Sequence, residues 1–217
     1  PEFTSSKKMH KPICFGMPLD GRNRTSPIYP LTTLILLDLG QPVVLHGASR
    51  MPVKYGITSL ELFQALGLCL DGLTIKNIEE SFAKYGFAFV HQPDHFQLAD
   101  SLIPYREEIG KRPPLASMEL LWTAHKGDHL LITGFVHPPT EKRHLLATKI
   151  LGEKHVVAIK GLEGSTDIPL NRPTKASKIK NNELEEFIIN PIAHKFNGKD
   201  IAWDNIDEWQ KICISAL

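Results

Sequence analysis

The chain has 217 residues, of which 42% are hydrophobic and 23% charged, and its formal net charge is +1. These values are typical of a folded globular protein. They exclude a disordered chain and a protein whose whole surface is basic, although they leave room for a local basic patch. Cys14, Cys69 and Cys213 are too few for a disulfide framework and lack zinc-ligand spacing, which indicates a reducing compartment. We therefore expect a cytoplasmic protein, with an organelle stroma as the alternative. The longest apolar run, residues 34–37, is far below the roughly 20 residues that span a bilayer, so no membrane partner is expected.

Three segments are predicted along the chain. Residues 1–10 begin with Pro1-Glu2-Phe3, which is typical of a cloning-site remnant, and are predicted to be a tag remnant and disordered leader. Residues 11–180 are predicted to form one α/β domain. Residues 181–217 are predicted to be an extension that ends in a helix packed on the same domain. We expect the chain to be part of a longer protein that contains a further helical domain.

Short runs of β-branched and aromatic residues, bounded by Gly or Pro, alternate with segments of helical spacing. Strands are predicted at residues 12–15, 43–46, 87–90, 130–136 and 156–160. Helices are predicted from Thr58 to Gly67, from Ile75 to Gly86, over residues 139–151, and from about Asp204 with Ile206, Trp209, Ile212 and Cys213 on one face. Residues 96–122 are predicted to be mostly helical, with breaks at Pro104 and Pro113-Pro114.

Strands that are almost continuously apolar and alternate with helices are typical of a mostly parallel sheet with helices on both faces. The predicted fold class is therefore α/β. In such sheets ligands bind beyond the carboxyl ends of the strands, so the loops that follow the strands are the candidate functional segments.

The first candidate loop follows the first strand and carries Gly16, Asp20, Arg22 and Arg24. Glycines and arginines before a helix can bind phosphate through backbone N–H groups and charge. The loop is neither a Walker loop nor a GxGxxG motif. An ordinary turn with solvated charges is the alternative.

The second candidate loop follows the second strand and carries His46, Gly47, Arg50 and Lys54. A histidine and two cations leave the sheet edge beside a glycine that allows close backbone approach to a ligand. Ordinary loop residues with surface charges are the alternative.

The third candidate loop follows the last predicted strand and carries Glu163 and Asp167. Two carboxylates near a glycine-rich turn can hold Mg²⁺, and a turn with exposed acids is the alternative. Arg106, in a charged segment that ends at Arg112, is a candidate anion-binding residue, and a helix-end charge cluster is the alternative.

In this order, the loops resemble anthranilate phosphoribosyltransferase and the glycosyltransferase family 3 superfamily. The resemblance extends from about Pro12 to Ile179. It rests on six short matches in order: His46-Gly47 with Gly56, Ala65-Leu66-Gly67, Tyr105-Arg106 to Ile109-Gly110-Lys111-Arg112, Gly134-Phe135-Val136, Ile150-Leu151-Gly152, and Gly161 to Asp167 with Pro173-Thr174.

This resemblance implies an α/β domain that binds phosphoribosyl pyrophosphate with Mg²⁺, an arginine at Arg106 that contacts the aromatic substrate, and a full-length homodimer. The family's Gly-Thr-Gly-Gly-Asp loop keeps only Gly16 and Asp20 here, and Pro18 has no N–H to offer a diphosphate. Lys-His-Gly-Asn becomes Leu45-His46-Gly47-Ala48, the phosphate-binding serines become Pro52 and Val53, and the Mg²⁺-binding Asp-Glu pair becomes Thr166-Asp167. The donor site is therefore predicted to be degenerate.

Three functions follow from these observations. The favoured one is a relative with weakened or lost phosphoribosyl transfer that binds nucleic acid or another phosphate-bearing ligand, such as a phosphorylated small molecule, at the loop edge of the sheet. The alternative is an active Mg²⁺-dependent phosphoribosyltransferase that acts on anthranilate or another nitrogen nucleophile. Mg²⁺ is expected as a cofactor only if donor binding is retained. The third is an interaction protein that docks a partner through the segment from Trp203 to Leu217, provided that Trp209 and Ile212 are exposed.

Overall fold

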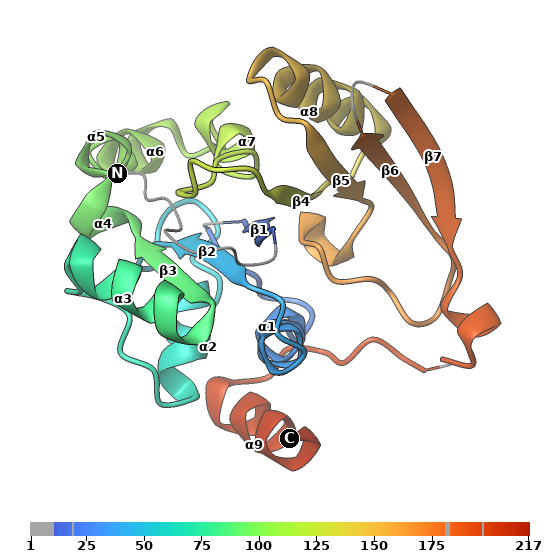
Figure 1. Cartoon of the computed structure of the whole chain (residues 1–217), viewed down its shortest axis with the longest axis horizontal. Helices are drawn as coiled ribbons and strands as arrows, with labels where there is room; N and C mark the ends of the chain where they lie inside the picture. Colours follow the sequence, from blue (N-terminus) through green and yellow to red (C-terminus); the bar gives the residue numbers. More distant parts are fainter. Residues whose placement is uncertain (1–10, 19, 181–182, 197) are drawn as a thin grey trace.

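The computed structural model describes residues 11–18, 20–180, 183–196 and 198–217, so the leader expected over residues 1–10 lies outside the described residues. The described residues form one sheet of seven strands in the order β3-β2-β1-β4-β5-β6-β7 (Figure 1). The strands are β1 (Ile13–Gly16), β2 (Val43–Gly47), β3 (Phe87–His91), β4 (Leu130–Gly134), β5 (His155–Ile159), β6 (Thr174–Lys180) and β7 (Glu183–Ile189). Neighbouring strands from β3 to β5 are parallel, whereas β6 and β7 are antiparallel additions at one side. The predicted α/β class with a mostly parallel sheet is confirmed.

The helices connect these strands. They are α1 (Tyr29–Asp38), α2 (Ser59–Ala65), α3 (Ile75–Tyr85), α4 (Gln92–His95), α5 (Gln97–Asp100), α6 (Ile103–Ile109), α7 (Leu115–Met118), α8 (Pro138–Ile150) and α9 (Ile206–Ala216), with 3-10 turns η1 (Leu162–Gly164) and η2 (Pro191–His194). Thr58 caps α2 and Thr74 caps α3, each through a side-chain oxygen that accepts a hydrogen bond from the third helical N–H. Gly86 ends α3 with φ of 73°, a conformation that favours glycine.

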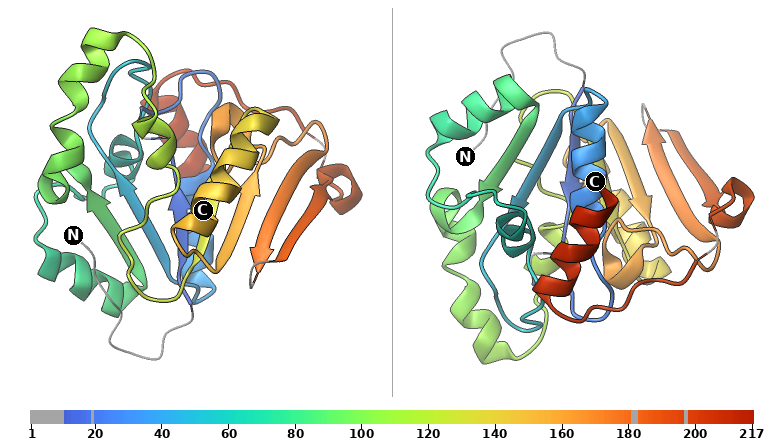
Figure 2. Two further views of the ribbon diagram at one scale, coloured as in Figure 1. Left: turned by 90° about the horizontal axis from the view of Figure 1, so that it is seen from above. Right: turned by 90° about the horizontal axis from the view of Figure 1, so that it is seen from below.

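Alternating strand residues point to opposite faces of the sheet, and each face has its own core. Phe15, Leu45 and Phe89 pack with residues of α1, α2 and α9, whereas Cys14 and Val44 pack with residues of α3 and α8. Figure 2 shows α9 beside α1 on one face and α8 on the other. Two faces covered by helices explain why the central strands are apolar without interruption.

Strands β6 and β7 are the strands that the sequence analysis did not predict. Their sequences mix Lys, Ser and Glu with apolar residues because much of this hairpin faces solvent, and Lys178 lies 2.8 Å from Glu185 on the neighbouring strand. The domain boundary expected at residue 180 falls inside this hairpin, so β7 continues the same sheet.

Helix α9 packs against α2 and against the core that contains Phe15, Leu45 and Phe89. Trp209 is only 2% exposed, and its indole N–H donates a hydrogen bond to the Pro27 carbonyl oxygen at 2.8 Å. Cys213 is also buried, but Ile212 is 39% exposed, so Ile212 does not share the buried face as the spacing predicted. None of the helices within the described residues is long and apolar enough to cross a membrane.

Candidate functional site

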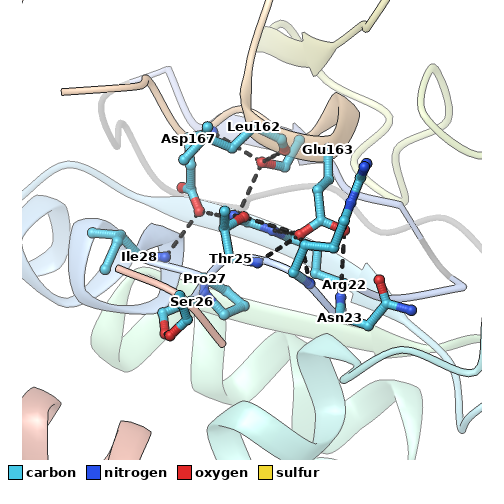
Figure 3. Close-up of polar contacts among 12 residues, drawn as sticks. Arg22, Asn23, Thr25, Ser26, Pro27, Ile28, Leu162, Glu163 and Asp167 are labelled. Atoms are coloured by element: carbon cyan, nitrogen blue, oxygen red, sulfur yellow. Dashed lines mark hydrogen bonds and ion pairs between the residues drawn. The ribbon is translucent and has the colours of Figure 1, made fainter. Parts of the chain in front are cut away.

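The residues predicted from the first and third loops meet beyond the carboxyl ends of β1 and β5. Arg22 and Thr25 follow β1, Lys54 follows β2, and Glu163 and Asp167 follow β5; we call these five residues the ion-pair cluster. Figure 3 shows Glu163 and Asp167 directed toward the segment from Arg22 to Ile28. Parallel strands bring their carboxyl ends to one edge, which is why residues about 140 positions apart come together.

Arg22 lies at the centre of this cluster and is almost fully buried. Its guanidinium donates to the Asp167 carboxylate, to the Thr25 hydroxyl, and to Ser165 Oγ at 3.2 Å. The Asp167 carboxylate also accepts a hydrogen bond of 2.9 Å from the backbone N–H of Ile28, the residue that precedes α1. Burial raises the pKa of Asp167, and the positive charge of Arg22 opposes this shift. The arginine predicted to bind an external phosphate is thus the internal counterion of an acid in the third loop.

Glu163 accepts hydrogen bonds from residues of both of the other loops. Its carboxylate accepts from Lys54 Nζ at 2.8 Å, from the hydroxyl and N–H of Thr25 at 2.9 Å each, and from the N–H of Arg24 at 3.1 Å. Burial raises the pKa of Glu163, but the hydrogen bonds from Lys54 and Thr25 outweigh it and hold the pKa at about 2. Glu163 has φ of 54°, which costs a non-glycine residue roughly 1–2 kcal/mol, and its many acceptor contacts offset that cost.

The ion-pair cluster does not fit a divalent cation as it stands. Both candidate metal ligands, Glu163 and Asp167, already carry buried or half-buried cationic partners. No group of three or more metal-ligating side chains occurs among the described residues. A cation such as Mg²⁺ would have to displace Arg22 and Lys54 before it could reach the carboxylates.

Gly16 and Gly47, which were predicted to lie in the first two loops, are the last residues of β1 and β2 and are packed against protein. A Cβ on Gly16 would lie 1.9 Å from the carbonyl oxygen of Leu120, and a Cβ on Gly47 would lie 2.7 Å from the ring of Phe89. These two glycines therefore make room for neighbouring parts of the chain rather than for the close approach of a ligand.

Two other predicted site residues have internal partners. Asp20 is buried and accepts from the guanidinium of Arg112 at 2.8 Å. Arg106 is buried and donates to Glu119, and burial lowers its pKa. The predicted role of Arg106 in binding an aromatic substrate stays a prediction.

His46, which lies in β2, and Arg50, which lies in the loop that follows β2, are both outside the ion-pair cluster. His46 is buried with its ring edge-on to Trp122 at 4.8 Å between ring centroids, and burial lowers its pKa to about 4, so the imidazole is neutral at pH 7. Arg50 pairs with Glu61 of α2 at 2.7 Å, and its side chain is 56% exposed. Arg24 is the most exposed of the predicted cations, with 76% of its side chain accessible and an ion pair to Glu163 at 3.6 Å.

Sequence reasoning missed Thr25, Ser165 and Glu119 as site residues. Each donates to or accepts from one of the predicted charges. The only signal for Thr25 and Ser165 is their position beside a charge in a loop that follows a strand, and that signal is shared by many surface residues. Glu119 lies in the segment between α7 and β4, and its spacing of 13 residues from Arg106 follows no helical or strand period.

Comparison with known proteins shows which proteins this chain is similar to. No protein-family model matches the chain. The chain is 25% identical over 170 residues to the anthranilate phosphoribosyltransferase of Chromobacterium violaceum, which covers 78% of this chain and 48% of that protein. It is 28% identical to the enzyme of Verminephrobacter eiseniae over 152 residues, and this alignment covers 70% of this chain and 43% of that protein. The chain thus spans about half the length of these relatives.

Solved structures show the same fold. Anthranilate phosphoribosyltransferase from Thermus thermophilus superposes with a TM-score of 0.74 at 18% identity, over 98% of this chain and 62% of that one. The Saccharomyces cerevisiae enzyme in complex with PRPP and Mg superposes with a TM-score of 0.77 at 14% identity, over 94% and 56%. Fold and sequence similarity together define a phosphoribosyltransferase-type α/β protein. More particularly, the proteins to which the chain is similar in both sequence and fold are anthranilate phosphoribosyltransferases.

Proposed function

We propose that this protein binds phosphate groups at the carboxyl edge of its sheet and that its Mg²⁺-dependent phosphoribosyl transfer is weakened or lost. The observation that carries the proposal is the position of Arg22, whose guanidinium is buried against the Asp167 carboxylate while Lys54 binds Glu163. The positive charges that would hold a diphosphate and the negative charges that would hold its metal neutralise one another.

The first loop supports the same conclusion. The Leu120 carbonyl oxygen occupies the space beside Gly16, and Pro18 contributes no N–H. Transfer of a phosphoribosyl group requires that donors be fixed around the diphosphate leaving group before reaction. A carbonyl oxygen at that position repels a diphosphate, so the donor cannot approach the backbone there.

Phosphate binding is supported by the cations that keep access to solvent. Arg24 and Arg50 lie on the first and second loops, and their side chains are 76% and 56% exposed. The Arg50–Glu61 pair is exposed on both sides and therefore weak, and Glu163 keeps Lys54 and Thr25 as partners when Arg24 leaves it, so a phosphate can bind either arginine at little cost. Nucleic acid and phosphorylated small molecules share this chemistry, and the experiment below distinguishes them.

The test is a titration with single-stranded DNA, single-stranded RNA, duplex DNA and inorganic phosphate at two salt concentrations. We expect nucleic acid to bind at low salt, and the double variant Arg24→Gln, Arg50→Gln to reduce the salt slope by about 0.7 per lost contact to a single strand. Arg172→Gln is the matched control, because Arg172 is 60% exposed and pairs with Asp200 in another part of the molecule. Binding of inorganic phosphate without nucleic acid would assign the site to small ligands. Absence of all binding at low salt, or equal losses in the control, would contradict the proposal.

An active phosphoribosyltransferase is the second candidate. It is favoured by the close superposition on the yeast enzyme in complex with PRPP and Mg. This candidate requires that a donor and Mg²⁺ separate Arg22 and Lys54 from the two carboxylates, and it predicts saturable binding of phosphoribosyl pyrophosphate that depends on Mg²⁺.

A further inference from the structure

A cavity of about 580 Å³ lies outside the ion-pair cluster. Its walls come from α4, from α7 and the segment that leads to β4, and from the turn between α8 and β5. In both Figure 1 and Figure 2, α7 lies between α4 and α8. The turns that precede β4 and β5 belong to the amino edge of the parallel strands, and none of the residues predicted for phosphate or metal binding lines the cavity. Its volume falls in the range of small-molecule sites.

Two aromatic rings form one wall. Phe96 and Trp122 have ring centroids 5.2 Å apart and an angle of 32° between ring planes, which is too close for a third ring to enter between them. Together they present a flat apolar surface, which Leu115, Met118 and Leu151 extend. Such a wall favours a planar ligand that stacks on one ring face.

Gln92 supplies a polar group without a partner. It is 1% exposed and lines the cavity, and its side-chain Nε2 has no hydrogen-bond partner among the described residues. A buried amide donor is normally satisfied, so this one calls for a ligand acceptor. A primary amide offers both a donor and an acceptor edge, which matches the paired edge groups of a purine or pyrimidine base.

The charges around the cavity favour an anion. Each acidic residue of the lining has a basic partner: Glu153 lies 3.0 Å from His129, Asp128 lies 2.9 Å from Lys11, and Glu119 pairs with Arg106. Lys154 is exposed at the cavity and forms no ion pair within the described part of the chain. Its ammonium can bind a phosphate that projects from a base held inside.

We propose that this cavity binds a nucleobase, as part of a nucleotide, with the base stacked on Phe96 and Trp122, hydrogen-bonded to Gln92, and its phosphate near Lys154. The proposal is independent of phosphate binding at the carboxyl edge, because the two sites share no residue. No bond is made or broken in it.

The test is calorimetric titration of the whole chain with adenosine, uridine and their monophosphates. We expect saturable binding of at least one base, and Gln92→Leu to weaken it by about tenfold, because the variant removes a buried hydrogen bond to the ligand. Lys154→Gln is a surface change that leaves the fold intact; it should weaken the monophosphate and leave the nucleoside unchanged. Lys160→Gln, an exposed lysine at the other edge of the sheet, should change neither.

Three results would overturn the proposal. They are the absence of saturable binding by every nucleoside and monophosphate, unchanged affinity in Gln92→Leu, and displacement of a bound nucleotide by inorganic phosphate alone. A single-stranded oligonucleotide provides a further arm. Gln92-dependent binding of the oligonucleotide supports the base site with nucleic acid as the source, and Gln92-dependent binding of the monophosphate alone supports it with a free nucleotide as the source.

Discussion

Buried and exposed arginine pairs have different energetic consequences in this molecule. Arg22 is buried against Asp167, whereas Arg50 pairs with Glu61 at the surface. We predict that Arg22→Met lowers the free energy of unfolding by about 3–5 kcal/mol, because it leaves the Asp167 carboxylate buried without its counterion. Arg50→Met, the matched control, should cost less than about 1 kcal/mol. Urea denaturation of the two variants measures the difference, and equal costs would mean that Arg22 is hydrated rather than buried.

Glu163 predicts a pH dependence of stability. Its pKa is about 2 in the folded protein and near 4.5 in the unfolded chain, so the folded state binds the proton less readily. The stabilisation is complete above the unfolded pKa and is lost as pH falls from about 4.5 toward 2. We predict that the melting temperature of the wild type falls through this window more steeply than that of Glu163→Gln, which has no carboxylate to protonate. Parallel melting curves for the two proteins would refute the assigned hydrogen bonds.

At the residue scale, the sequence predicted that the candidate loops meet at one edge of the sheet, but not how their charges pair. The loops that carry Arg22, Lys54 and Glu163 were predicted to share one edge, because parallel strands bring their following loops together. The pairing of Arg22 with Asp167 depends on the path of the first loop, and no periodicity in the sequence encodes that path. The left-handed conformation of Glu163 is likewise unpredictable, because this conformation is typical of glycine.

At the element scale, the predicted strands and helices differ in how clearly the sequence marked them. The capping residue Thr58 and the terminator Gly86 lie where the pattern placed them. The hairpin of β6 and β7 was missed because its outer strand is mostly exposed and rich in glutamate, a residue depleted in strands. Lys175 and Lys178 of β6 pair with Glu186 and Glu185 of β7 across this hairpin.

Helix α9 provides a prediction at the element scale. Trp209→Ala should lower the free energy of unfolding by about 3–5 kcal/mol, because it opens a cavity beneath the helix and leaves the Pro27 carbonyl oxygen without its donor. Ile212→Ala should cost much less, because Ile212 is already 39% exposed. Denaturation in urea compares them. A small effect of Trp209→Ala would indicate that α9 is detached in solution and would restore the alternative of a docking helix.

At the scale of the whole molecule, the fold class could be predicted and the balance of charge in the site could not. Alternation of apolar strands with helices is a local pattern that survives divergence to 25% identity with the Chromobacterium relative. A net charge of +1 indicates only that positive and negative groups are nearly equal in number. The structure shows how the charges pair at the carboxyl edge of the sheet: Arg22, Lys54 and Arg112 each form an ion pair with a carboxylate.

The central claim is that this internal pairing has replaced the metal-dependent donor site. Calorimetric titration with phosphoribosyl pyrophosphate, once with Mg²⁺ and once with a chelator, tests it most directly, with the Thermus enzyme as the positive control. We predict that Mg²⁺ changes the affinity of this protein by less than about threefold, because Glu163 and Asp167 remain bound to Lys54 and Arg22. An affinity that rises by more than about tenfold with Mg²⁺ would show that the carboxylates are released to the metal and would contradict the account.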